Sequence, residues 1–139
     1  MLNLELLIYT LLRNGLDQSI TLAPELDVDS IDAFPLVTFT VTGGSAVQGS
    51  SSPPTAWDVG LLLNIFHDDL AEASQIASDV YDLVWSWDDV FGGTGIADGI
   101  GHASEVDDQE LFNRAGTVHI EARSVTQYSG SFNMQLHDA

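Results

Sequence analysis

The chain has 139 residues, 45% of them hydrophobic, which is enough for one domain with a buried core and excludes wholesale disorder. It carries 21 acidic residues against three arginines and no lysine, for a net charge of −18, so it cannot form the basic patch that binds a nucleic-acid backbone. It has no cysteine, which excludes disulfides, thiolate nucleophiles and thiolate metal sites.

The first predicted element is an amphipathic helix over residues 2–13. Its leucines and Ile8 recur at the i, i+3, i+4, i+7 spacing of one helical face, and Gly15 stands where a helix is expected to stop. The segment lacks a basic n-region and a small-residue cleavage site and contains Glu5, so we do not expect an export signal. No apolar run approaches the ~18 residues of a membrane span. We therefore expect a soluble product without membrane association, made in a cytoplasm.

A short strand is expected at residues 20–23, and two long strands at residues 34–42 and 56–67. In the first long strand valine and phenylalanine alternate with threonine, which predicts one buried and one half-polar face. The second long strand alternates apolar residues from Trp57 to Ile65 and carries further apolar residues on its other face. This pattern predicts a central strand that is covered on both sides.

These two strands are joined by fourteen small, uncharged residues, Gly43 to Ala56, although a hairpin needs only two to five. No ionisable residue occurs between Ala33 and Trp57. An acidic surface that stops being acidic indicates a region that meets other protein, because copies of the same charge otherwise repel each other. The loop can extend to at most ~45 Å, which suffices to touch a neighbouring subunit. A disordered surface loop is the alternative.

The clearest element is a helix over residues 68–87, which Asp68 or Asp69 can cap. Three acidic residues, Glu72, Asp79 and Asp82, are expected to face water. The apolar stripe consists of Leu70, Ala73, Ile76, Ala77, Val80, Leu83, Val84 and Trp87.

The rest of the chain predicts strands after a glycine-rich connection at residues 88–101. Alternating segments are expected as strands at residues 100–108, 115–129 and 131–137. The predicted fold class is α+β, with an antiparallel four- to five-stranded sheet and two helices packed on one of its faces. The whole chain, residues 1–139, is expected to be a single domain with a long flexible loop at residues 43–56.

No segment has the pattern of a catalytic or cofactor site. The nucleophile motif G-x-S-x-G is absent, and "GGTGIADGIG" has Asp98 where a dinucleotide-binding loop needs its third glycine. The four histidines lack metal-ligand spacing, and His119 is expected to be solvated. The acid clusters "DVDSID" (27–32) and "EVDDQE" (105–110) are interpreted as solvated surface, with loose cation binding as the alternative. We therefore expect no enzyme activity, no cofactor and no metal.

The order of these segments resembles one family of viral proteins. A leucine-rich helix precedes "FPLVTFTVTGG", a long loop leads to "WDVGLLLNIFHDD", the helix "LAEASQIASDVYDLVWSW" follows, and strands that include "GTVHIEARSVTQY" close the chain. This arrangement is similar to the tail terminator proteins of long-tailed phages and their archaeal viral relatives, the family of lambda's tail terminator. The resemblance spans nearly the whole chain and depends on element order rather than on an invariant motif.

The resemblance implies an α/β fold in a homohexameric ring that caps the finished tail tube, stops its polymerisation and joins the tail to the head. The implied partners are the tail tube protein and the head–neck connector proteins of the virion, while DNA passes through the lumen without specific binding. No catalytic residues are implied. The interface residues that the family's loop contacts imply are Gly43, Gly44, Val47, Pro53, Pro54, Phe91, Gly93 and Ile96.

The charge adds a second interpretation. A lysine-free, aspartate-rich composition resembles that of haloarchaeal proteins, because in ~1 M salt the Debye length falls to ~3 Å and self-repulsion is screened. An ordinary acidic surface protein is the alternative. In a ring, carboxylates that line the channel would repel DNA phosphates. Three other functions stay open: another neck or tail-completion component, an acidic DNA mimic that inhibits an enzyme, and a cation-binding accessory domain.

Overall fold

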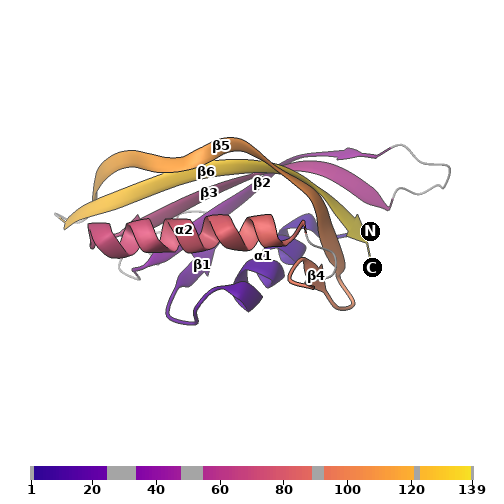
Figure 1. The fold of residues 1–139 in the computed structure, drawn as a ribbon, viewed down its shortest axis with the longest axis horizontal. Helices are drawn as coiled ribbons and strands as arrows, with labels where there is room; N and C mark the ends of the chain where they lie inside the picture. Colours follow the sequence, from indigo (N-terminus) through magenta and orange to yellow (C-terminus); the bar gives the residue numbers. More distant parts are fainter. Residues whose placement is uncertain (1, 25–33, 48–54, 89–92, 121–122, 139) are drawn as a thin grey trace.

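The computed structural model describes residues 2–24, 34–47, 55–88, 93–120 and 123–138. For residues 109–120 and 123 it gives the backbone. The described residues form two helices and one six-stranded sheet (Figure 1). The helices are α1 (Leu4–Gly15) and α2 (Leu70–Ser86). The strands are β1 (Thr21–Ala23), β2 (Leu36–Ala46), β3 (Ala56–His67), β4 (Ile96–Ala97), β5 (Gly101–Ile120) and β6 (Arg123–Asp138).

The strand order is β1-β2-β3-β6-β5-β4. Neighbouring strands are antiparallel except β1 and β2, which are parallel. The predicted antiparallel sheet of four to five strands is therefore corrected to a mixed sheet of six. Periodicity does not encode strand direction, and β4 has two residues, too few for an alternating pattern. Both helices lie on the same side of the sheet, as expected (Figure 1).

The three strands predicted after residue 100 are two long strands. β5 runs without a break to Ile120, and β6 pairs with it from Arg123 onwards. The reversal thus falls inside the segment predicted as one strand over residues 115–129. That prediction was wrong because "HIEARS" contains no glycine, proline, asparagine or aspartate, the residues by which a turn is recognised.

The helices begin at side-chain caps. The Asn3 side chain accepts a hydrogen bond from the Leu6 N–H at 3.0 Å, so α1 begins at Leu4 rather than at residue 2. Asp69 accepts from the Glu72 N–H at 3.0 Å and is the cap of α2, in place of Asp68. The first residue of each helix is thus fixed by a local hydrogen bond and does not depend on packing against the sheet.

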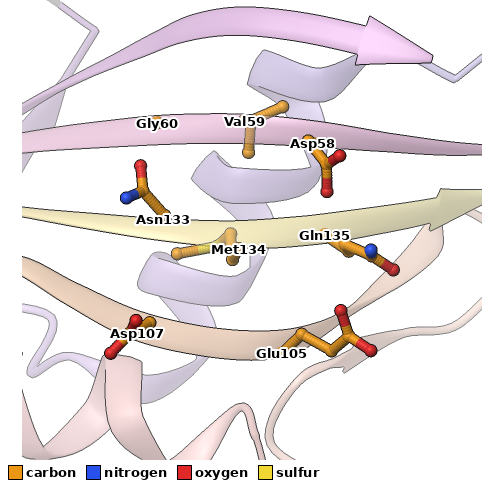
Figure 2. Close-up of a pocket in the computed structure, with 8 residues that line it drawn as sticks. All are labelled: Asp58, Val59, Gly60, Glu105, Asp107, Asn133, Met134 and Gln135. Atoms are coloured by element: carbon orange, nitrogen blue, oxygen red, sulfur yellow. The ribbon is translucent and has the colours of Figure 1, made fainter. Parts of the chain in front are cut away.

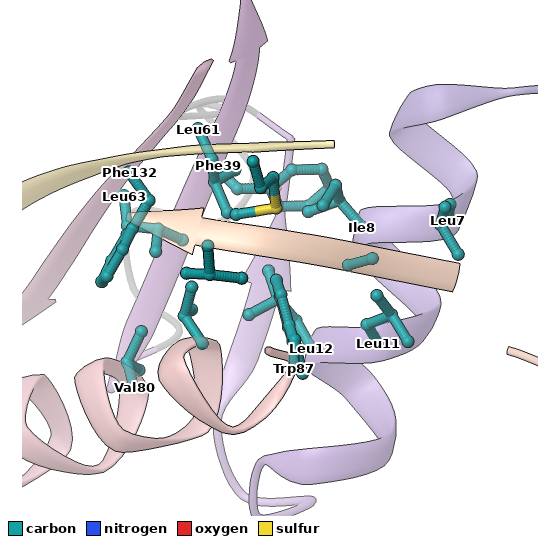
Figure 3. Close-up of a cluster of buried hydrophobic side chains, with 14 of the residues drawn as sticks. Leu7, Ile8, Leu11, Leu12, Phe39, Leu61, Leu63, Val80, Trp87 and Phe132 are labelled. Carbon is teal, nitrogen blue, oxygen red and sulfur yellow. The ribbon is translucent and has the colours of Figure 1, made fainter. Parts of the chain in front are cut away.

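Most of the predicted apolar stripe of α2 faces the core. Ala73, Ala77, Val80, Val84 and Trp87 are buried, whereas Leu70 is 48% exposed and does not join the stripe. The side chains that meet in the core come from both helices and from β2 to β6. Figure 3 shows part of this cluster. The cluster includes Leu7, Ile8, Leu11, Leu12, Phe39, Leu61, Leu63, Val80, Trp87 and Phe132. Each fully buried side chain of this size contributes about 1.5–3 kcal/mol of transfer free energy, which holds both helices on the sheet.

The helices cover one face of the central strand β3, and its other face is buried at Phe66, so the predicted cover on both sides holds only at that end of the strand. Val59, Leu61, Leu63 and Ile65 are buried beneath the helices, but Leu62, on the other face, is 37% exposed. The other face therefore remains available for function. In the described part of the chain no helix is long and apolar enough to cross a membrane.

Candidate functional site

The sheet face opposite the helices, which we call the uncovered face, is uncharged in its middle. Because side chains alternate along each strand, the residues next to the buried ones point to this face. The Gln127 side-chain amide donates to the Asn64 side-chain oxygen at 3.0 Å and links β6 to β3. The middle zone consists of Thr38, Thr40, Leu62, Asn64, Gln127, Ser129 and Ser131. In a chain with 21 acidic residues, this zone carries no charge: its side chains are hydroxyl and amide groups apart from the exposed Leu62, and Thr38 among them is buried.

One end of the uncovered face is apolar. Leu36, Phe66 and Val125 are buried there together with Ala23 of β1, and Phe34 packs against them. This small cluster explains why β1 is held at the edge of the sheet. The half-polar face predicted for β2 is therefore confirmed for its threonines, while Leu36 joins the apolar end.

The opposite end of the uncovered face contains an open hollow of about 420 Å³. Asp58 of β3 and Glu105 and Asp107 of β5 surround it, and the amide side chains of Asn133 and Gln135 of β6 lie between them (Figure 2). Three carboxylates at one hollow repel anions such as phosphate. Among the described residues, no three histidine, aspartate or glutamate side chains form a group that could hold a metal ion.

A β-bulge shapes this hollow. The β5–β6 register shifts between Ser104 and Asp107, and Glu105 has a φ of 52°. The Asp88 carboxylate, just after α2, accepts a hydrogen bond from the Val106 N–H at 3.0 Å and fixes the bulge from the helix side. Val106 consequently points into the core, while Asp107 returns to the uncovered face.

Two histidines lie at the same end of the sheet. His102 and His137 are directly opposite each other on β5 and β6, and their rings stack with centroids 4.5 Å apart. The Nε2 atom of His137 is 2.8 Å from the Ser104 hydroxyl oxygen. Burial, and next the charge of His102, lower the pKa of His137 below its ordinary value of 6.5, while Glu105 opposes this shift. Among the described residues, no third ligating side chain joins this pair to form a group that could hold a metal ion.

The described part of the acid cluster "EVDDQE" is only partly solvated. Asp107 is exposed, but the Asp108 carboxylate points to the helix side and accepts hydrogen bonds from the Tyr81 hydroxyl at 2.9 Å and the Trp85 indole at 3.1 Å. Asp108 is therefore a structural residue, contrary to the prediction. The segment "DVDSID" and the side chain of His119 lie outside the described residues.

Three of the predicted interface residues lie at the far end of the β2–β3 hairpin. Gly43 and Gly44 have φ values of 82° and 89° at a bulge, a conformation that favours glycine. The Val47 N–H donates to the Ala56 carbonyl at 2.9 Å and prolongs the hairpin beyond β2. Gly44 also approaches Leu4, in the first turn of α1.

The other predicted residues do not join this group. Gly93 (φ 75°) and Ile96, which is 44% exposed, lie beside Gly15, in the last turn of α1. A helix of twelve residues is ~18 Å long, so α1 separates the two groups. Pro53, Pro54 and Phe91 lie outside the described residues.

The sequence did not reveal the open edges of the sheet. β1 pairs with β2 only at Leu36–Thr38, and β4 pairs with β5 only at Gly101 and His102. Among the described residues, the remaining outer edges of β2 and β5 have no neighbouring strand. No periodicity reports this, because an edge is defined by strand order.

Leu6 and Tyr9 of α1, 46% and 39% exposed, were also missed, although they are apolar residues outside the buried stripe.

Comparisons with known proteins give a likeness in structure but none in sequence. No protein-family description and no curated protein sequence matches the chain. Among solved structures, it is similar to a chain of the "Virion of native gene transfer agent (GTA) particle", with a TM-score of 0.49 and 12% sequence identity. The alignment covers 96% of this chain and 94% of that chain. These values assign neither a family nor a function to this chain, and its function is argued below from its own residues.

Proposed function

We propose that this chain is a virion structural protein that assembles with copies of itself. More specifically, we propose a ring-forming tail terminator, a homohexamer that caps the tail tube, stops its polymerisation and joins the tail to the head. The element order in the sequence supports this proposal. The observation that carries it is a sheet whose helices cover one face only, in a chain of net charge −18. The other face has a neutral middle zone, and among the described residues the outer edges of β2 and β5 are largely unpaired.

Neutral surfaces matter in this chain because charged groups are costly to dehydrate. Interface cores are depleted in charged residues, and a carboxylate buried without a partner costs several kcal/mol. With three arginines, the chain has few cations to pair its carboxylates across an interface. A contact between copies is therefore favoured where at least one of the two surfaces has no acid. The outer edge of β2 is such a surface.

The middle zone of the uncovered face suits a passage for DNA. Binding of a DNA backbone requires lysine and arginine at phosphates, and the described part of the uncovered face contains neither. Its hydroxyl and amide groups are neutral, and the hollow formed by Asp58, Glu105 and Asp107 repels phosphate. A ring that presents this face to its lumen would let DNA slide through without specific binding. Tail tube and head–neck connector proteins would then meet the two rims.

Native mass spectrometry and sedimentation in ~1 M salt or above test the proposal, since the Debye length there is ~3 Å and repulsion between copies is screened. We expect a closed species of about six copies of the 15.0 kDa chain. A stable monomer over the accessible concentration range would contradict the ring. A monomer that binds a basic DNA-binding protein would instead indicate an acidic DNA mimic.

A further inference from the structure

The outer edge of β2 offers unused backbone hydrogen-bonding groups. At the start of the strand, the Thr21 N–H donates to the Pro35 carbonyl at 2.9 Å, so odd-numbered residues there direct their backbone groups towards β1. The β2–β3 register is regular from Leu36 to Gly43. Because direction alternates along a strand, the N–H and C=O of Val41 point away from β3, beyond the last residue of β1 that pairs with β2.

This edge lacks the usual protection against pairing. Soluble proteins protect long edges with charged side chains, prolines or very short strands. β2 is eleven residues long and contains no charged residue and no proline. Its only irregularity is the bulge between Gly43 and Ser45. Thr42, Ser45 and Ala46 are exposed, so another strand can approach this edge.

The opposite edge of the sheet has complementary properties. Beyond Ala103 the outer edge of β5 has no neighbouring strand in the described part of the chain. Its exposed residues Glu105 and Asp107 are acidic, so the β5 edges of two copies repel each other. A contact between β5 of one copy and the uncharged β2 of another does not place like charges together. Three successive antiparallel pairings separate β2 from β5, so the two edge strands run in opposite directions.

We propose that the edge of β2 from Phe39 to Ala46 pairs with the outer edge of β5 in a second copy of this chain, as an antiparallel ladder. The contact is heterologous, because one copy uses β2 and the next uses β5. Such contacts repeat around a ring and leave no edge open once it closes. The inference deepens the proposed ring and rests on it for closure, while the strand pairing itself is tested separately.

Cysteine cross-linking tests this contact, because the chain has no cysteine of its own. Ser45→Cys and Asp107→Cys place thiols on the exposed side of the two edges, and Thr42→Cys provides a second register. The two single variants are mixed in molar salt and treated with a mild oxidant or a short bis-maleimide. We expect cross-linked dimers in the mixture and few in either variant alone. Ser78→Cys, exposed on α2, is the matched control and should not cross-link with Asp107→Cys.

The outcomes separate the strand contact from the ring. A ring by mass without cross-links between the β2 and β5 positions would overturn the strand pairing and leave the ring intact. Cross-links between copies of the Ser45→Cys variant alone would indicate a two-fold β2–β2 contact and would also overturn the proposed pairing of β2 with β5. A monomer in molar salt would overturn both proposals.

A charge variant gives an independent measurement on the same edge. Ala46→Asp adds a carboxylate to an edge that the proposal places beside the acidic β5 edge, and Ala46→Asn is its uncharged control of the same size. We expect the concentration needed for assembly to rise about tenfold or more for Ala46→Asp alone. Equal assembly of the two variants would contradict the proposal.

Discussion

His137 makes the stability of this protein depend on pH near neutrality. Its pKa lies below 6.5, chiefly because its ring is partly buried and next because His102 is stacked on it. The unfolded chain therefore binds a proton at a higher pH than the folded chain does. Stability is fully present above about pH 6.5 and is lost as the pH falls towards the lowered pKa of the folded state.

We expect urea unfolding at constant high salt to show a falling free energy of unfolding from about pH 7.5 to about pH 5.5. His137→Asn should remove much of this slope, because asparagine does not titrate. The shifted Asp17 does not confuse the result, since its pKa is lowered from 3.8 and lies outside this range. An unchanged slope in His137→Asn would show that other groups cause the dependence.

At the scale of elements, Asp108 fixes α2 on β5. Its carboxylate accepts hydrogen bonds from Tyr81 and Trp85, both on the helix, and this contact raises the pKa of the Tyr81 hydroxyl. Asp108→Ala removes an acceptor that two donors share, and we expect it to lower the free energy of unfolding by about 1–3 kcal/mol. Asp107→Ala, on the exposed face of the same strand, should change it by about 0.5 kcal/mol or less. Denaturant unfolding measures both, and equal effects would show that the helix contact contributes little.

The elements that the sequence predicted well are those whose signals are local. β3 has the predicted bounds, and both helices begin and end within two or three residues of their predicted positions, because caps and apolar periodicity are properties of neighbouring residues. The turn between β5 and β6 has no such signal and was missed. Asp107 and Asp108 are adjacent and identical, yet one is exposed and the other bonded, which only the bulge and the position of α2 decide.

The candidate site was predictable only in part, for the same reason. The absence of charge between Ala33 and Trp57 is visible in the sequence and marks β2 correctly as a neutral strand. That β2 and β5 are open edges follows from strand order, which depends on contacts distant in the chain. The three carboxylates of the hollow come from β3 and β5, which lie on either side of β6 in the sheet. Asp58 and Glu105 are more than forty residues apart in sequence.

At the scale of the whole molecule, net charge decides under which conditions the fold and any assembly are stable. A chain of −18 repels itself, and the repulsion extends over ~10 Å at 0.1 M salt but only ~3 Å at 1 M. Folding and ring closure both bring these charges together. The neutral edge of β2 and the neutral middle zone of the uncovered face do not offset this repulsion. We therefore propose that the protein requires high salt, as its lysine-free composition indicates.

Stepwise dialysis from molar to dilute salt, followed by circular dichroism and sedimentation, measures this requirement. We expect loss of the assembled species first, because repulsion between copies adds to repulsion within each copy, and unfolding at lower salt. Replacing exposed acids of α2, as in Asp79→Asn with Asp82→Asn, should shift both transitions to lower salt, since both side chains are exposed and the change removes charge with little change in size. Replacing Ser74 and Ser78 with alanine on the same helix is the uncharged control and should shift neither. Full folding and assembly in dilute buffer would exclude a salt requirement and would leave the acidic surface to be explained by its partners.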